Sequence, residues 1–337
     1  MPSMPVEDLV IQRPEGLYCP AGDFFIDPMR AVPRAVITHA HADHARAGHG
    51  AALAAQPGLG VLRARLGAQP MQGLAWGEAV DQGGVRVSLH PAGHVLGSAQ
   101  VRLQHQGKVW VVSGDYFCSP WGDRNPTCEP FEPVPCDVFV TESTFASPLY
   151  RWRPQAEVLA QINQWWQANA ADGVTSVVLA YSFGKAQRLL AGVDASIGPL
   201  LVHESVEHMN RACRAAGMRL PATPVLGPDT DPALLARSLV VMPPQAKACG
   251  PASAGPAATA FASGWMRVAK ARTRRGSGRG FVLSDHSDWP GLLQAVAATG
   301  AERVVVHHGP TDTLVRWLQE QGLQAGTFAA ARPGRTA

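Results

Sequence analysis

The sequence lacks long apolar runs and is poor in charged residues. No stretch of its 337 residues reaches the ~18 consecutive apolar residues that a membrane-spanning helix needs. The first 17 residues carry acidic and basic side chains and no apolar segment, so we expect no signal peptide, a cytoplasmic location and no membrane partner. Charged residues make up only 16% of the chain, but hydrophobic residues reach 46%, which excludes extensive disorder.

Cysteine pairs typical of structural zinc sites are also missing. The six cysteines are scattered, and none forms a C-x-x-C pair, which favours free thiols in a reducing compartment. Cys118, Cys128 and Cys136 lie close enough in sequence for a zinc site, although their spacing matches no zinc ribbon. A cysteine zinc site therefore stays open as an alternative.

Lysine is scarce too, with 4 Lys against 25 Arg. The planar guanidinium group of arginine suits phosphate better than the lysine ammonium does. GC-rich coding produces the same bias, so this composition alone does not indicate a phosphate-bearing partner.

The order of predicted elements indicates an α/β protein of roughly two domains. Short β-branched runs dominate the first part of the chain, and the middle alternates strands with helices. The predicted strands are 34–38, 85–90, 99–103, 108–112, 137–141, 176–180, 281–284 and 303–306. The predicted helices are 155–170, 184–191, 289–298 and 313–322, with one further strand and helix in 200–217.

A cluster of ligand-type side chains directly follows the predicted strand at 34–38. His39, His41, Asp43 and His44 fall within six residues. His39 and His41 can converge on one metal ion, while Asp43 and His44 turn toward a second. Imidazole and carboxylate together suit Zn or Mn. A single histidine in a β-rich core is usually a packing residue, but three with an aspartate at this spacing indicate a metal site.

Further ligand-type residues follow other apolar runs. A sheet delivers such side chains to one edge, so we expect them to gather with the first cluster. Each alone could be a loop-capping residue, but the set makes that explanation weak. These residues are Asp27, His94, Asp115, Glu142, His286 and His308.

Together these motifs resemble the β-CASP branch of the metallo-β-lactamase superfamily, a group of nucleic-acid hydrolases. Segment 182–190 is similar to the β-CASP stretch of the pre-mRNA 3′-end cleavage endonuclease. Over nearly its whole length, and notably in 15–23 and 131–137, the chain looks most like bacterial ligase-associated DNA exonucleases.

The resemblance implies a fold and a domain order. It implies an αββα metallo-β-lactamase sandwich in 1–149, a β-CASP α/β domain inserted at 150–280, and a return to the sandwich in 281–337. The active site is then expected in the cleft between the two domains.

The resemblance also implies roles for the motif residues. His39, His41 and His94 would bind one divalent ion, and Asp43, His44 and His308 a second, with Asp115 bridging them. Asp27 would orient the histidine loop. His286, held by Glu142, is the candidate to protonate the leaving oxygen or stabilise charge. His307 precedes His308, but the residue next to glycine fits the family pattern better.

The expected activity is hydrolysis of a nucleic-acid phosphodiester. Two divalent ions, Zn or Mn, ~3.5–4 Å apart can bind the phosphate and lower the pKa of a bridging water toward ~7, so that hydroxide attacks. The overall resemblance favours a DNA repair exonuclease, with a DNA ligase and a helicase as partners. Glu142 and His308 instead look like the RNA-processing members, so an exo- or endoribonuclease is the alternative.

Two further segments could contact nucleic acid. A basic segment before His286 contains Arg267, Lys270, Arg272, Arg274, Arg275 and Arg279, and no acidic residue. It could bind substrate phosphates, or it could be a solvated loop. In 150–153, Arg151 and Arg153 alternate with aromatic residues that could stack on a base. Packing at the domain junction explains this second segment equally well.

Two other classes of protein compete with a nuclease. A small-molecule hydrolase, such as a glyoxalase II or a lactamase, would need neither the β-CASP motifs nor the basic segment. A non-catalytic scaffold would be expected to have lost ligands, whereas every ligand position here is filled.

Overall fold

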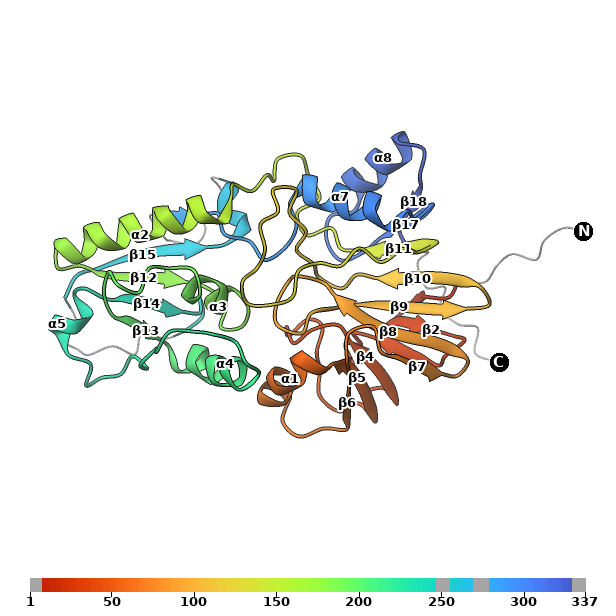
Figure 1. Cartoon of the computed structure of the whole chain (residues 1–337), viewed down its shortest axis with the longest axis horizontal. Coiled ribbons are helices and arrows are strands. Elements are labelled where there is room, and N and C mark those ends of the chain that lie inside the picture. Colours follow the sequence, from red (N-terminus) through yellow and green to blue (C-terminus); the bar gives the residue numbers. More distant parts are fainter. Residues whose placement is uncertain (1–7, 247–254, 269–278, 329–337) are drawn as a thin grey trace, which may run out of the picture.

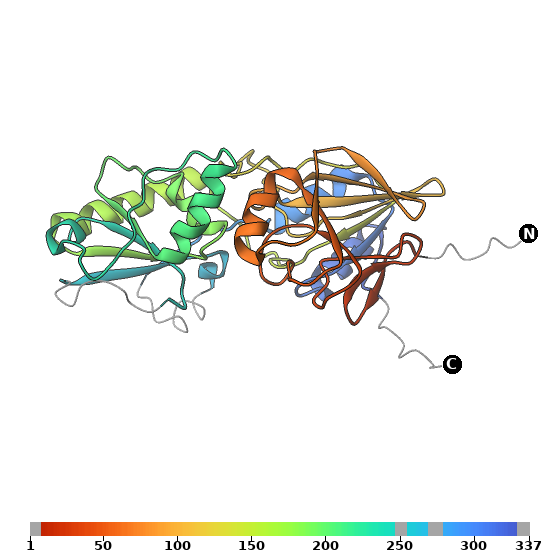
Figure 2. The same cartoon turned by 90° about the horizontal axis from the view of Figure 1, so that it is seen from below.

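The protein is a mixed α/β structure with three sheets. The computed structural model describes residues 8–246, 255–268 and 279–328. Two lobes lie side by side along the long axis, as both views show (Figure 1 and Figure 2). The first lobe contains two sheets and both described ends of the chain, and the second contains one sheet with its helices.

The two sheets of the first lobe are built from the N-terminal half and the C-terminal segment. The six-stranded sheet, in spatial order, contains β1 (Ile11–Arg13), β2 (Gly16–Cys19), β3 (Phe24–Ile26), β4 (Arg34–Ile37), β5 (Ala51–Ala55) and β6 (Met71–Leu74). The seven-stranded sheet contains β18 (Gln324–Gly326), β17 (Arg303–Val306), β11 (Val138–Thr141), β10 (Lys108–Val112), β9 (Ala99–His105), β8 (Val85–Pro91) and β7 (Ala79–Gln82).

The hairpin predicted between 99–103 and 108–112 is confirmed as β9 and β10. Lys108 pairs with His105, and Val112 pairs with Val101 in an antiparallel ladder. The turn between these strands uses Gln106 and Gly107, both with positive φ, which suits the twist of a tight hairpin.

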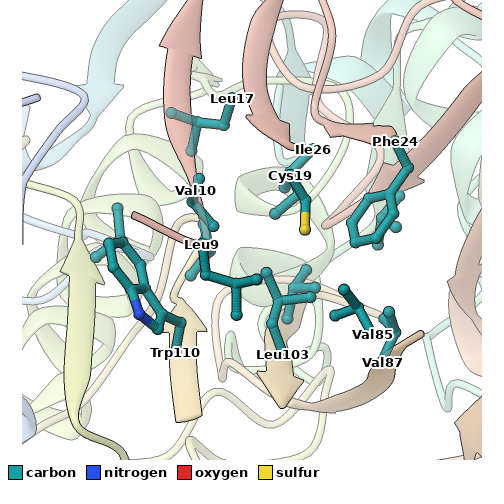
Figure 3. Packing of buried hydrophobic residues seen from close by; sticks show 14 of the residues in the cluster. Leu9, Val10, Leu17, Cys19, Phe24, Ile26, Val85, Val87, Leu103 and Trp110 are labelled. Atoms are coloured by element: carbon teal, nitrogen blue, oxygen red, sulfur yellow. The ribbon is translucent and has the colours of Figure 1, made fainter. Parts of the chain in front are cut away.

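The sandwich core lies between the two sheets (Figure 3). Alternating residues point inward from each sheet, so Leu17 and Phe24 on one side meet Val87, Leu103 and Trp110 on the other. All of these side chains are buried.

Helices cover the outer faces of both sheets. Helices α7 (Trp289–Thr299) and α8 (Asp312–Glu320) lie against the seven-stranded sheet, with Leu292 and Leu314 fully buried. After the short η1 (Gln56–Gly58), α1 (Leu59–Leu66) packs against the six-stranded sheet. The layers therefore run helix, sheet, sheet, helix.

The second lobe is a parallel five-stranded sheet with helices. Its order is β13 (Leu200–Val202), β14 (Leu239–Met242), β12 (Thr175–Leu179), β15 (Ala257–Ala262) and β16 (Arg279–Phe281). Its helical elements are α2 (Gln155–Ala171), α3 (Lys185–Leu190), α4 (Glu204–Ala215), α5 (Pro232–Leu235) and the short η2 (Gly264–Arg267). Met209 and Cys213 of α4 pack in one cluster with Leu62 of α1, which joins the lobes.

One predicted strand is shifted toward the N-terminus. We expect a strand at 281–284, but the observed strand β16 ends at Phe281 and pairs with β15 of the second lobe. The chain turns directly after β16, where Leu283 N donates to the Phe281 carbonyl at 3.0 Å, and Ser284 Oγ then accepts a hydrogen bond from His286 N at 3.1 Å.

Among the helices that the structure describes, none combines the length and the apolar character that a membrane span requires.

Candidate metal centre

The ligand-type residues gather where strands end. The parallel neighbours β10, β11 and β17 deliver their following loops to the same edge, and these loops carry Asp115, Glu142 and His308. Residues from both lobes line a cavity of about 500 Å³ at this edge, and His41, Asp43 and His286 are among them.

Three histidines and Asp115 form the first group of candidate ligands. His41 Nδ1 lies 3.1 Å from His39 Nε2 and 3.0 Å from His94 Nε2. Asp115 Oδ2 lies 3.6 Å from His39 Nε2 and 3.8 Å from His94 Nε2. The four ligand atoms lie within 4.8 Å of one another, so one ion could contact all of them.

The positions of the protons on the His41 and His94 rings leave room for a cation between the two rings. His41 Nε2 contacts the Phe183 carbonyl at 3.2 Å, and His94 Nδ1 contacts the Asp285 carbonyl at 2.8 Å. A carbonyl only accepts hydrogen bonds, so these two nitrogens carry the protons. In neutral rings the inward-facing nitrogens are then both unprotonated, and their lone pairs converge at 3.0 Å. A divalent metal ion satisfies such an arrangement.

Burial keeps these rings neutral. Desolvation lowers the pKa of His39 and of His94 well below the usual value, and it also lowers the pKa of His41. Neutral imidazole is the form that binds metal, so the site favours the state needed for ligation.

A second group of candidate ligands lies on the other side of Asp115. His308 Nε2 is 3.9 Å from Asp43 Oδ2 and 3.7 Å from Asp115 Oδ1, and His44 Nε2 is 3.3 Å from Asp115 Oδ2. Within the described residues, the buried atoms His44 Nε2 and Asp115 Oδ1 have no hydrogen-bond partner. Buried unsatisfied polar atoms are costly, and a bound ion would satisfy both.

Asp27 contacts His44 of this second group on the side away from the other ligands. Its carboxylate accepts hydrogen bonds from Thr38 N at 2.7 Å and contacts His44 Nδ1 at 2.7 Å. Burial alone would lower the pKa of His44, but the carboxylates of Asp115 and Asp27 raise it well above the usual value, so a metal ion bound at Nε2 would displace a proton. The contact fixes which nitrogen of His44 faces the other ligands.

His308, rather than His307, faces the centre. His308 has a positive φ of 57° and is followed by Gly309, also with positive φ, which turns its ring toward Asp43. The ring of His307 packs at 5.7 Å from that of Phe328 instead.

His286 and Glu142 form a buried pair beside both groups. His286 Nδ1 lies 3.0 Å from each carboxylate oxygen of Glu142, and its Nε2 lies 3.9 Å from Asp115 Oδ2. Burial lowers the pKa of His286, but the negative charges of Glu142 and Asp115 outweigh it and raise that pKa to about 9. Because Nδ1 faces Glu142, it is Nε2 that His286 presents toward Asp115 and the cavity.

An aromatic cluster holds His286 from the other side. Trp152 Nε1 donates to the His286 carbonyl at 2.9 Å, and its ring lies 4.9 Å from that of Phe145. Trp152 is thus a packing residue at the junction, one of the two roles that the sequence left open. The adjoining Arg151 and Arg153 are exposed.

The second lobe contacts the centre through a glycine turn. Gly184 has φ +85°, and a Cβ built there would lie 2.4 Å from Val95 Cγ1 and 3.3 Å from His41 Nε2. Only glycine allows this close approach, which brings the Phe183 carbonyl to His41. Beside it, the buried ammonium of Lys185 pairs with the Asp285 carboxylate.

Sequence reasoning missed these contacts from the second lobe. The carbonyls of Phe183 and Asp285 carry no side-chain signature, so no residue type could have indicated them. Asp285 itself lies next to His286 and could have been noticed as an ionisable residue in that motif. Asn125, which donates to the His94 carbonyl at 2.7 Å, was also missed.

The basic segment is only partly described. Arg267 lies at the end of η2 and is exposed, and Arg279 is exposed with its guanidinium 5.1 Å from the centroid of the Phe281 ring. Lys270, Arg272, Arg274 and Arg275 lie outside the described residues.

The cysteine zinc site kept as an alternative does not form in the described part of the chain. None of the groups of candidate metal ligands there contains a cysteine. Burial raises the pKa of Cys118 to about 11 and of Cys128 and Cys136 to about 12, so these thiols are protonated in the metal-free protein.

Comparisons with known proteins give matches over part of those proteins. No family model matches the chain. It is 31% identical over 318 residues to a probable DNA ligase of Opitutus terrae, covering 92% of this chain and 30% of that protein. It is 28% identical over 115 residues to the endoribonuclease YSH1 of Candida glabrata, covering 34% of this chain and 14% of that one.

The chain is also similar to a third relative and to a solved structure. The cleavage and polyadenylation specificity factor 73 of Drosophila melanogaster is 30% identical over 117 residues, covering 35% of this chain and 16% of that protein. A protein of unknown function from Enterococcus faecalis V583 has the same general fold, with a TM-score of 0.56 at 11% identity over 82% of this chain and 75% of that one. The chain spans 30% or less of the length of these curated relatives, and it resembles nucleases among them at low identity.

Proposed function

We propose that the protein is a binuclear-metal phosphodiesterase that hydrolyses nucleic acid, and that it acts as a DNA exonuclease in DNA repair. The observation that carries this proposal is the pair of ligand groups joined by the single carboxylate of Asp115. The relatives named as a DNA ligase and an endoribonuclease support a nucleic-acid substrate.

The proposal includes the architecture that the sequence motifs imply. The two-sheet lobe would be a metallo-β-lactamase domain formed by 1–149 and 281–337, and the five-stranded lobe a β-CASP domain formed by 150–280. The four-layer arrangement of the first lobe and the position of the cavity between the lobes support this division.

Each ligand group would hold one Zn or Mn ion. His39, His41 and His94 would bind one ion, and the second would lie among the other group, with Asp115 between them. The ligands of that second group would be Asp43, His44 and His308. Two such ions would supply charge neutralisation for a phosphate and an activated water.

The remaining residues of the site would orient the histidine rings or donate a proton to the substrate. Asp27 holds His44 through Nδ1, and Glu142 holds His286 in the same way, so each ring presents Nε2 to Asp115. His286 would donate a proton to the leaving oxygen or a hydrogen bond to the phosphate, because its Nε2 faces Asp115 at the cavity floor. Asp43 lines the same cavity and would help to orient the attacking water.

Support for DNA as the substrate comes from the longer similarity. The match to the probable DNA ligase covers 92% of this chain. The proposal includes work beside a DNA ligase and a helicase in the cytoplasm, as the resemblance of the sequence motifs implies. The alternative is RNA processing, which the relatives named endoribonuclease YSH1 and cleavage and polyadenylation specificity factor 73 favour over about a third of the chain. The exposed Arg151, Arg153 and Arg267 are candidate phosphate contacts.

The test uses matched single strands. Protein reconstituted with Zn or Mn is incubated with DNA and RNA of one sequence, each labelled at one end or the other, with Asp115→Ala as the control. We expect stepwise shortening of DNA that disappears in the variant, and the label reveals the polarity. Preferential cutting of RNA would support the alternative, and cleavage that persists in Asp115→Ala would refute the proposed centre.

A further inference from the structure

The cavity over the candidate metal centre has a wall that the proposed chemistry does not use. Its floor contains Asp43, Asp115 and His286, and part of its wall is formed by Tyr181 and Trp265 of the second lobe. The volume of about 500 Å³ is within the range of small-ligand sites and larger than one phosphate group needs.

Tyr181 presents an exposed ring from a fixed backbone. Its side chain is 45% exposed and lines the cavity. Its carbonyl accepts a hydrogen bond from Ala186 N at 3.1 Å, and the carbonyl of Ser182 accepts one from Gln187 Nε2 at 3.0 Å. Because Phe183 contacts His41, this turn is held in register with the metal centre.

The ring of Trp265 packs against other aromatic rings. Its ring lies 4.7 Å from that of Phe145 and 5.8 Å from that of Tyr150, and Phe145 in turn packs 6.0 Å from the ring of His286. Its backbone N–H donates to Ser263 Oγ at 3.3 Å. The half-buried indole therefore has little freedom to move, although it lines the cavity.

We propose that Tyr181 and Trp265 form a nucleobase subsite next to the phosphate position, an inference that rests on the proposed nuclease function. A base stacked on Tyr181 would place its own nucleotide's phosphate toward Asp115 on the floor of the same cavity. Stacking on aromatic rings tolerates any sequence, because every base has a π-face. A base in this position has left its duplex stack, so the subsite selects a single-stranded end.

The test combines variants of Tyr181 with substrates that lack one base. Single strands carrying one abasic nucleotide at successive positions are cleaved by the wild type, Tyr181→Ala and Tyr181→Phe. Trp121→Ala is the matched control, since Trp121 is 67% exposed and is absent from the cavity lining. We expect Tyr181→Ala to raise KM about 10-fold, with Tyr181→Phe and Trp121→Ala close to the wild type.

The abasic series locates the subsite. At one position the missing base should weaken the wild type to the level of Tyr181→Ala and leave that variant unchanged, because both changes remove the same contact. Equal losses in wild type and variant at every position would overturn the proposal.

A binding readout separates this proposal from the proposed function. With metal chelated, 2-aminopurine at the located position should be quenched by the wild type more strongly than by Tyr181→Ala. If the wild type cleaves nucleic acid but the two proteins quench equally, the subsite is wrong and the nuclease stands. If the wild type neither cleaves nor quenches any strand, the nuclease and the subsite both fail.

Discussion

Replacing Gly184 by alanine tests whether the second lobe positions the metal centre. Gly184 has φ +85° and ψ −76°, a conformation that side-chain-bearing residues rarely adopt, and the new methyl group would lie 2.4 Å from Val95 Cγ1. Backbone strain costs about 1–3 kcal/mol and overpacking about 1–3 kcal/mol. We expect the free energy of unfolding to fall by about 2–6 kcal/mol in urea denaturation with metal chelated.

The matched control is Gly173→Ala. Gly173 also has a positive φ, +68°, but an added Cβ there meets no atom within 4 Å. Both variants place a side chain at a positive φ, but only Gly184→Ala also overpacks its surroundings, so Gly184→Ala should lose at least about 1 kcal/mol more stability than Gly173→Ala.

The same variant should weaken metal binding. Moving the turn at Gly184 separates the Phe183 carbonyl from His41 Nε2, and loss of such a supporting contact typically lowers metal affinity about 10–100-fold. Competition with a chelator measures the change, with Gly173→Ala expected to bind like the wild type. Equal stability and equal metal affinity in the two variants would refute the argument that the close approach is needed.

Three other substitutions test single contacts. Lys185→Met leaves the buried carboxylate of Asp285 without its partner, so the free energy of unfolding in urea should fall by about 3–5 kcal/mol. A fall below about 1 kcal/mol would count against that ion pair. Trp152→Phe removes the hydrogen-bond donor to the His286 carbonyl but keeps an aromatic ring. The kcat for nucleic-acid cleavage should therefore fall with little change in KM, and an unchanged kcat would contradict a positioning role for Trp152. Asp27→Asn should weaken metal binding about 10–100-fold in chelator competition, and an unchanged affinity would show that this carboxylate does not support the second group.

Much of the candidate centre could be predicted because its side chains lie next to simple local signals. His39, Asp115 and His308 each come just after a buried β-branched strand, so the position in the sequence already indicates the sheet edge. The glycine after His308 already favoured it over His307, and the positive φ of His308 gives the physical reason why its ring turns toward Asp43.

Other parts could not be predicted because tertiary contacts decide them. Strand β5 (Ala51–Ala55) is mostly alanine, which has weak strand propensity, and it forms because β4 and β6 flank it. Strand β15 (Ala257–Ala262) is similar, held between β12 and β16. The pair Lys185 and Asp285 joins residues 100 positions apart, a separation that no local pattern spans.

Counting the bound metal ions tests the central claim most directly. Native mass spectrometry of protein reconstituted with Zn or Mn should show two ions per chain, because the ligand groups on either side of Asp115 each have the atoms to hold one. The Asp115→Ala variant should hold fewer than two, since it loses the carboxylate that lies within 4 Å of ligand atoms from both groups. A wild type that binds one ion or none, or a variant that still binds two, would contradict the account.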